Sequence, residues 1–204
     1  MRNTNGRLND VIILASTSPT RRALLANAGL RYESIAPDID EKALLQRNPH
    51  WTPAEASRRL AKSKSVDVSQ HHPNAIVIGA DQVLACEGQI FGKPVDADHC
   101  REQLTYLRGK DHFLISSVVC ALNGFSIWAY AQTATMTMRN FSDAFLVDYL
   151  QSAGPRCTSS VGGYQLENQG IQLFDNIDGD YFAILGLPMI PLLNFLRFVK
   201  AIPS

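Results

Sequence analysis

Residues 11–22 read VIILASTSPTRR, an apolar run that gives way to hydroxyl side chains, a proline and paired arginines. The apolar part, Val11–Ala15, has the length and composition of a strand that is buried on both faces. Ser18 is placed to cap a helix that begins at Pro19, and Gly29 is placed to end it. A strand followed at once by a helix opens a βα unit, which indicates an α/β protein.

The chain beyond this stretch repeats the strand and helix pattern and then adds a hairpin. Residues 52–55, TPAE, have the form of a capping box and predict a helix that continues through Lys64. Residues 75–78 predict a second buried strand. Two β-rich runs meet at Asn123-Gly124, a pair that favours a tight hairpin turn because both residues tolerate positive φ. We therefore expect an α/β fold with a mixed twisted sheet flanked by helices and a cleft between its halves.

The remaining length predicts further elements but no second domain. Strands are expected near residues 171–174 and 181–185, and a last helix after Pro188. A length of 204 residues fits one α/β unit or two small lobes packed together. We divide the chain into an N-terminal extension, residues 1–10, and a single domain, residues 11–204.

Composition excludes several classes of protein. Nineteen basic residues balance nineteen acidic ones, so nothing indicates a general nucleic-acid binder. The four cysteines form no C-x-x-C pair, so reduced and mostly buried thiols are expected in place of a zinc site or disulfides. No apolar run reaches the roughly 18 residues that a membrane span needs, and the polar start has no signal-peptide pattern. We expect a cytoplasmic protein that binds neither nucleic acid nor membrane.

The loop after the first strand carries groups that could bind an anion. A strand that feeds a helix directly presents free backbone N–H groups, the hydroxyls of Ser16 and Ser18 and the guanidinium of Arg21 near one point. The alternative is that the serines only cap the helix while the arginines are solvated. Spacing alone does not choose between the two.

Acidic residues stand at two further places where chemistry could occur. Asp81 follows the second buried strand, and α/β sheets usually bind ligands at the carboxyl ends of their strands. It could instead cap the turn into Gln82. Asp38, Asp40 and Glu41 form a cluster that could supply oxygen ligands to magnesium, although the pattern alone favours a solvated turn.

Five separated stretches together carry a resemblance to one family. These stretches are residues 13–22 (ILASTSPTRR), 36–41 (APDIDE), 79–83 (GADQV), 92–94 (GKP), and 179–181 (GDY) with 186–188 (GLP). In order and spacing the chain resembles the Maf family from about residue 11 to residue 200. The resemblance implies a Maf or ITPase-like fold, with two lobes around a nucleotide-binding cleft.

The resemblance also implies roles for particular residues. Asp81 would be the proton acceptor that activates a water for attack on the α-phosphorus of a nucleoside triphosphate. Residues that would hold the phosphates are Ser16, Ser18, Arg21, Lys64 and Lys93. Without the family position, Lys64 would be taken for an exposed helical lysine. Magnesium would bridge the phosphates, with Asp81 and Glu41 as its protein ligands.

Three positions depart from the commonest Maf pattern where that family selects its substrate. They are Thr20, Gln82 and Glu167, and Gln82 with Glu167 resembles the branch that prefers 7-methylguanosine triphosphate. A carboxylate can accept hydrogen bonds from N1–H and N2–H₂ of guanine, and 7-methylation adds a positive charge that an acid favours. Glu167 could also be an ordinary exposed loop acid.

The expected activity is hydrolysis of the α–β phosphate bond of ordinary or modified nucleoside triphosphates, with a homodimer as the family expectation. The products would be a nucleoside monophosphate and pyrophosphate, and the role would be to remove non-standard nucleotides. A rival hypothesis is a non-catalytic nucleotide-binding regulator of cell division and septum formation. The retained Asp81 and lysines favour chemistry, because a sensor has little need of a poised base.

Overall fold

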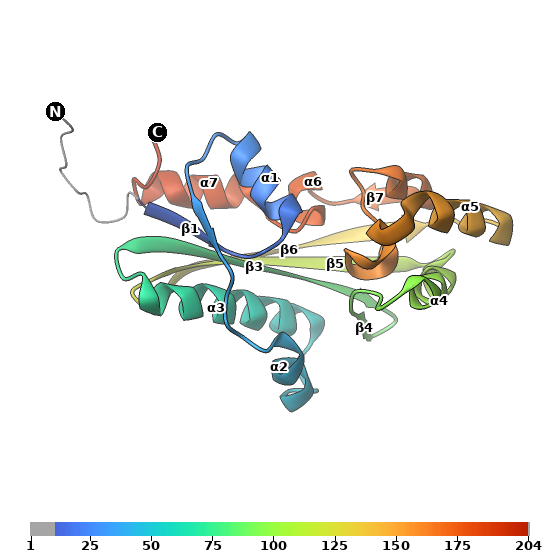
Figure 1. Ribbon diagram of the computed structural model, residues 1–204, viewed down its shortest axis with the longest axis horizontal. Coiled ribbons are helices and arrows are strands. Elements are labelled where there is room, and N and C mark those ends of the chain that lie inside the picture. Colours follow the sequence, from blue (N-terminus) through green and yellow to red (C-terminus); the bar gives the residue numbers. More distant parts are fainter. Residues whose placement is uncertain (1–10, 204) are drawn as a thin grey trace. The chain divides into compact units, whose positions relative to one another are not determined.

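The computed structural model describes residues 11–203 (Figure 1), so the predicted extension at residues 1–10 lies outside the described part. These residues form a mixed seven-stranded sheet in the order β2-β1-β3-β5-β6-β7, with β4 paired to β3, and helices flank it. The expected fold class is confirmed. The chain divides into two compact units: unit 2 comprises Gln82–Ile115 and Gln132–Leu185, and unit 1 comprises the rest.

The elements are distributed between the units as follows. Unit 1 contains β1 (Val11–Ala15), α1 (Pro19–Asn27), β2 (Glu33–Ile35), α2 (Glu41–Arg47), α3 (Pro53–His71) and α7 (Met189–Phe198). Unit 2 contains β4 (Gln89–Phe91), α4 (Ala97–Leu107), α5 (Asp143–Ala153), β7 (Phe174–Asp178), α6 (Tyr181–Ile184) and the 3-10 helices η1 (Gly154–Thr158), η2 (Val161–Gly163) and η3 (Gln169–Leu173). Each unit receives a part of β3 (Ala75–Cys86), β5 (Asp111–Leu122) and β6 (Phe125–Met138).

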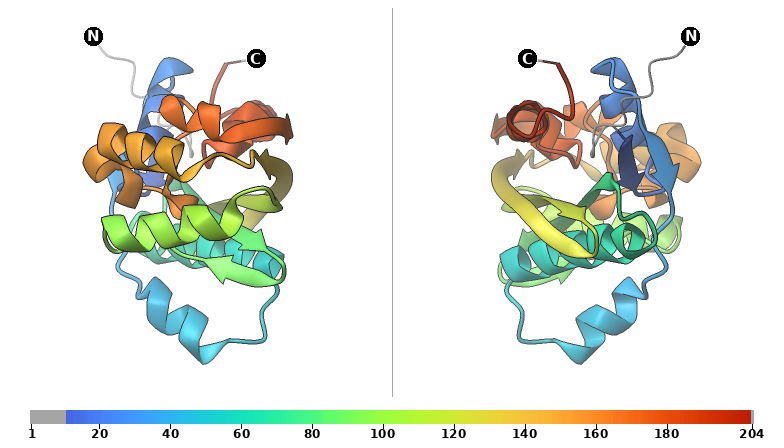
Figure 2. Two further views of the ribbon diagram at one scale, coloured as in Figure 1. Left: turned by 90° about the vertical axis from the view of Figure 1, so that its right-hand side faces the viewer. Right: turned by 90° about the vertical axis from the view of Figure 1, so that its left-hand side faces the viewer.

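Unit 1 is built on parallel strand pairing. The central strand β1 pairs in parallel with both β2 and β3, and Leu14 stands opposite Ile78. Ile13, Val77 and Val68 of α3 contribute to one buried apolar cluster, as expected for a strand covered on both faces. Figures 1 and 2 place α3 on one face of these strands and α1 and α7 on the other.

A glycine sets the close approach of β3 to α3. A side chain at Gly79 would collide with the carbonyl oxygen of Ala61, and its Cβ would lie 2.6 Å from the backbone nitrogen of Ser65. The absence of a Cβ therefore allows the strand and the helix to come into backbone contact. This contact fixes which face of α3 points at the end of β3.

Unit 2 has its own apolar core. The helices α4 and α5 contact each other and pack on the unit 2 parts of β3, β5 and β6 (Figure 2, left view). Cys100 of α4 and Cys157 of η1 belong to this core. All four cysteines of the chain are free and buried, which confirms the expectation of reduced thiols.

A buried histidine lies in the same core. His112 is fully buried, and its Nε2 lies 2.7 Å from the hydroxyl of Tyr164. Its Nδ1 has no hydrogen-bond partner among the described residues. Burial lowers the pKa of His112 to about 4, against a weaker opposite effect of Asp111. The neutral ring is therefore a packing group of the fold.

The burial of neutral His112 predicts that the folded protein loses stability in acid. Because the pKa of His112 is about 4 when folded and near 6.5 when unfolded, the unfolded chain binds more protons between those values. The free energy of unfolding should thus fall by up to about 3 kcal/mol as pH drops from 6.5 to 4. Urea titrations at a series of pH values test this. His112→Gln should lose most of that dependence, whereas His50→Gln, at an exposed position, should keep it; equal slopes for both variants would contradict the assignment.

Some predicted elements are confirmed and others are wrong. The hairpin is present, with Asn123 and Gly124 at φ values of 49° and 79°. The run at residues 181–185 is not a strand: Asp180 accepts a hydrogen bond from the backbone N–H of Ala183 (2.8 Å) and starts the short helix α6. A short apolar run does not by itself distinguish the two structures. Residues 169–173 form η3, so the strand expected near residue 171 begins only at Phe174, where β7 pairs with β6.

The second buried strand is longer than expected. Residues 75–78 were predicted, but β3 continues through Asp81 to Cys86 because Leu84 and its neighbours pair with β4. Asp81 therefore lies within a strand and not at its carboxyl end. Its position still lies beyond the end of β1, whose pairing with β3 stops at Ile78. No helix among residues 11–203 is long and apolar enough to cross a membrane.

Candidate active site

The loop between β1 and α1 is held by hydroxyl groups. Ser16 Oγ accepts a hydrogen bond from the backbone N–H of Ser18 (3.1 Å), and Ser18 Oγ caps α1 by accepting from the N–H of Arg21 (3.4 Å). Ser34 of β2 donates its hydroxyl to the carbonyl oxygen of Ser16 (2.8 Å). Helix capping is thus confirmed for Ser18, whereas the alternative that these serines do nothing else while Arg21 is solvated is not met, since Arg21 bonds Gly186. Capping leaves the hydroxyl hydrogens of Ser16 and Ser18 as donors for an anion, so capping and anion binding are compatible.

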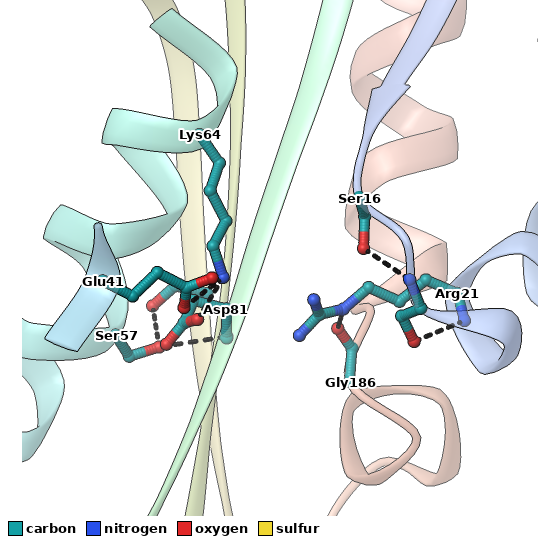
Figure 3. A network of polar contacts seen from close by, with 9 residues as sticks. Ser16, Arg21, Glu41, Ser57, Lys64, Asp81 and Gly186 are labelled. Atoms are coloured by element: carbon teal, nitrogen blue, oxygen red, sulfur yellow. Dashed lines mark hydrogen bonds and ion pairs between the residues drawn. The ribbon is translucent and has the colours of Figure 1, made fainter. Parts of the chain in front are cut away.

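Arg21 reaches from this loop toward a group of charged side chains. Its Nε donates to the carbonyl oxygen of Gly186 (2.9 Å), and Figure 3 shows the rest of the guanidinium extending toward the side of the site that holds Asp81. Burial lowers the pKa of Arg21, while the charges of Asp81 and Glu41 act in the opposite direction. An arginine stays protonated under such conditions, so the site keeps a fixed positive charge.

Lys64 lies at the centre of the charged group. It projects from α3 with only 6% of its surface exposed. Its Nζ lies 2.7 Å from Asp81 Oδ1 and 2.8 Å from Glu41 Oε2 (Figure 3). The alternative of an exposed helical lysine is therefore wrong. A buried ammonium with carboxylate partners on both sides is an organised electrostatic site and not a solvated surface pair.

Asp81 has the electrostatic properties of a proton acceptor. Burial raises the pKa of Asp81, and the positive charges of Lys64 and Arg21 partly counteract that effect. A raised pKa makes a carboxylate a stronger base, which is the property that general base catalysis near neutral pH requires. The alternative that Asp81 merely caps a turn is wrong, because β3 continues through it.

A pair of serines beside Asp81 was not anticipated from the sequence. Ser57 Oγ lies 3.1 Å from the backbone carbonyl oxygen of Asp81 and 2.9 Å from Ser117 Oγ. Figure 3 shows Ser57 beside Asp81. The sequence feature that could have pointed to Ser57 is helical spacing, since Ser57 precedes Lys64 by two turns and so shares its helix face. Helical spacing alone could not identify what that face contacts.

The acidic cluster before α2 separates into different roles. Asp40 caps α2 by accepting from the N–H of Ala43 (2.8 Å), whereas Glu41, the first residue of that helix, turns its carboxylate to Lys64. The interpretation of this cluster as only a solvated turn is thus wrong for Glu41. Its side chain is 46% exposed, so one side of the pair faces solvent.

The residues present fit a metal only together with a substrate. Asp81 and Glu41 converge on one ammonium group, yet no cluster of three or more His, Cys, Asp or Glu side chains suited to a metal exists within residues 11–203. Magnesium commonly binds through one or two carboxylates while substrate phosphates and water supply its remaining ligands. Two carboxylates that meet at one point satisfy that requirement.

The other predicted residues occupy varied surroundings. Thr20 lies partly exposed in the first turn of α1. In unit 2, Gln82 Nε2 donates to the carbonyl oxygens of Ala183 (3.1 Å) and Ile184 (2.9 Å), so its amide anchors α6. Lys93 and Glu167 are exposed on loops of unit 2. Unit 1 therefore brings together the predicted residues Ser16, Ser18, Arg21, Glu41, Lys64 and Asp81.

Comparison with known proteins assigns the family. Residues 11–199 match the family described as Maf-like protein. The chain belongs to the Maf family. The match covers both units, and it confirms the resemblance inferred from the separated sequence stretches.

Curated members of the Maf family are similar to this chain over nearly its whole length. A protein of Rhodopseudomonas palustris (strain HaA2) named nucleoside triphosphate pyrophosphatase is 45% identical over 189 residues, which cover 93% of this chain and 94% of the relative. Two proteins named 7-methyl-GTP pyrophosphatase are equally similar. That of Rhizobium meliloti (strain 1021) is 45% identical over 97% of this chain and all of the relative. That of Brucella abortus biovar 1 (strain 9-941) is 46% identical over 94% and 97%.

Proposed function

We propose that this protein is a nucleoside triphosphate pyrophosphatase, which hydrolyses the bond between the α and β phosphates to release a nucleoside monophosphate and pyrophosphate. The observation that carries the proposal is the buried Asp81 carboxylate, held 2.7 Å from Lys64 in the same unit as the Ser16–Ser18 loop and Arg21. The names of the Maf relatives support the same activity.

The residues of unit 1 divide the chemistry between them. Asp81 accepts a proton from a water molecule as that water attacks the α-phosphorus, and the bond from phosphorus to the bridging oxygen breaks. Arg21 and the hydroxyls of Ser16 and Ser18 donate to phosphate oxygens and stabilise the charge that develops on the pyrophosphate. Lys64 holds the Asp81 carboxylate in place, and it keeps its proposed role as a phosphate ligand, as the family resemblance implies. Lys93, which lies on an exposed loop of unit 2, keeps its proposed role as a further phosphate ligand on the strength of the family resemblance alone.

Magnesium is part of the proposal. Asp81 and Glu41 would hold it together with phosphate oxygens of the substrate, in the place where both carboxylates now meet Lys64. The ion would act as a Lewis acid that withdraws charge from the phosphates. Lys64 would then need to share the carboxylates with the ion, which its long flexible side chain allows.

The proposed base preference is for 7-methylguanine, with Thr20, Gln82 and Glu167 as the residues that set it. Glu167 is exposed and so free to accept hydrogen bonds from a guanine edge. Glu167→Gln should lower the ratio of kcat/KM for 7-methyl-GTP to that for UTP by about tenfold, because it removes a charge complementary to the methylated base. Steady-state kinetics on both substrates give this ratio. Gln169→Glu, an exposed change at the start of the neighbouring helix η3, is the control and should leave this ratio unaltered. An unchanged ratio in Glu167→Gln would instead assign Glu167 to the loop surface.

Pyrophosphate release from a panel of ordinary and modified nucleoside triphosphates tests the function. The wild type should release pyrophosphate with magnesium present and lose activity when the metal is chelated. The fastest substrate reports the base preference. Tight nucleotide binding without release from any triphosphate would overturn the catalytic proposal and leave the nucleotide-binding regulator of cell division.

A homodimer and a cytoplasmic location belong to the same proposal. Unit 1 carries exposed apolar side chains on β6 and α7 that a second copy could cover, namely Phe125, Ile127, Tyr130 and Phe198. Sedimentation equilibrium should then give a mass twice that of one chain, which is 22.5 kDa. Ile127→Lys should lower the measured mass toward that of one chain. A nucleotide-hydrolysing enzyme would meet its substrates in the cytoplasm.

A further inference from the structure

Two buried hydroxyl groups connect three elements of unit 1 at Asp81. Ser57 of α3 and Ser117 of β5 are both fully buried. Ser57 Oγ is within hydrogen-bond distance of the Asp81 carbonyl oxygen (3.1 Å) and of Ser117 Oγ (2.9 Å). A hydroxyl has one hydrogen to donate, so a Ser57 that donates to the carbonyl can accept from Ser117. The result is a short chain of hydrogen bonds that ends on the main chain of Asp81.

The same helix face delivers both contacts to Asp81. Ser57, Ala61 and Lys64 follow one another at helical spacing on α3, and Ala61 is the residue whose backbone touches Gly79 of β3. Lys64 binds the carboxylate, and Ser57 binds the carbonyl oxygen of the same residue. Asp81 is thus attached to α3 at two points, one on its side chain and one on its main chain.

Other serines of α3 behave differently. Ser65 donates to the carbonyl oxygen of Lys62 in its own helix (3.0 Å), which is a common local use of a helical serine. Ser69 accepts from the backbone N–H of Gly124 in the hairpin turn (2.9 Å). Ser57 is distinguished from both, because one of its hydrogen bonds reaches Asp81, the residue that also binds Lys64.

We propose that Ser57, supported by Ser117, is a positioning residue that fixes the direction of the Asp81 carboxylate toward Lys64. The inference rests on the proposed function, in which Asp81 activates the attacking water. The carbonyl and the carboxylate of Asp81 are joined by a short side chain, so a main chain held by Ser57 limits the positions open to the carboxylate. A base that must point at one water molecule gains rate from such restriction, because small misplacements of a catalytic group are costly.

Ser57→Ala tests the proposal, with Ser69→Ala as its matched control. Both variants remove one buried hydroxyl from α3, but only the first breaks a contact with Asp81. We expect kcat of Ser57→Ala to fall by about tenfold with KM nearly unchanged. Ser117→Ala should show a smaller change of the same kind.

An NMR measurement that does not depend on catalysis tests the positioning role of Ser57 separately from the proposed pyrophosphatase activity. In proteins with ¹³C-labelled aspartate carboxyl groups, the chemical shift of the Asp81 carboxyl carbon at one fixed pH should change in Ser57→Ala and stay unchanged in Ser69→Ala. Melting temperatures of both variants monitor any loss of stability. An unchanged Asp81 carboxyl signal in Ser57→Ala would overturn the positioning role whether or not the wild type is active. Absence of pyrophosphate release by the wild type, with the change in that signal present, would instead reject only the proposed function.

Discussion

Asp81→Asn should abolish pyrophosphate release, lowering kcat by about a thousandfold or more, because loss of a general base costs 10²–10⁴ and asparagine cannot accept the proton. The substitution keeps the size of the side chain and leaves Lys64 with its second partner, Glu41. Nucleotide binding through the Ser16–Ser18 loop and Arg21 should therefore persist. Kinetic assays of release, together with a binding titration, would distinguish lost chemistry from lost affinity.

The stability of this variant provides the control. Burial raises the pKa of Asp81 in the folded chain, so the native state binds more protons than the unfolded one between the unfolded and folded pKa values. The ionised carboxylate therefore lowers the stability of the wild type as pH rises through that window, and Asp81→Asn should not show this decline. Asp143→Asn, which removes a carboxylate from an exposed ion pair with Arg108, should retain activity. An active Asp81→Asn would remove Asp81 from its role.

Local sequence rules predicted those parts of the fold that depend on neighbouring residues. The strand Val11–Ala15 and the helix that begins at Pro19 lie where the sequence indicated, because cap and strand signals act over a few residues. The turn at Asn123-Gly124 was predictable for the same reason. In contrast, α6 was mistaken for a strand, since the cap at Asp180 decides between two structures that a short apolar run permits equally.

The site required information that no short stretch contains. Glu41, Lys64 and Asp81 come from separate elements, and the local pattern gave each of them an ordinary explanation. Only the family resemblance suggested a shared role. The packing of α3 on β3 brings Asp81 to Lys64, and the contact of α2 with α3 brings Glu41 to it. Ser57 was missed because the importance of its hydroxyl depends on its contact with Asp81, which comes from tertiary packing. A serine in a helix has no sequence signal for such a partner.

The packing of α3 on β3 makes Gly79→Ala the substitution with the largest expected effect on stability. The added Cβ would collide with the Ala61 carbonyl oxygen and lie 2.6 Å from the Ser65 backbone nitrogen. Backbone atoms cannot rotate away, so α3 must move from the strand, at a cost of about 3 kcal/mol or more. Ala61 and Ser65 flank Lys64 on α3, so the displacement should also weaken the 2.7 Å contact with Asp81. Urea unfolding and pyrophosphate release measure the two effects.

Gly92→Ala is the matched control for this argument, because a Cβ at that position meets no atom within 4 Å. Its unfolding free energy should change by only a few tenths of a kcal/mol, as is usual for surface substitutions. If Gly79→Ala were as stable as Gly92→Ala, then α3 would not be held against β3 by this backbone contact. If stability fell while kcat per folded molecule stayed constant, the position of Lys64 would not depend on it. A joint loss of stability and rate is expected, because one contact sets both the packing of the helix and the place of its ammonium group.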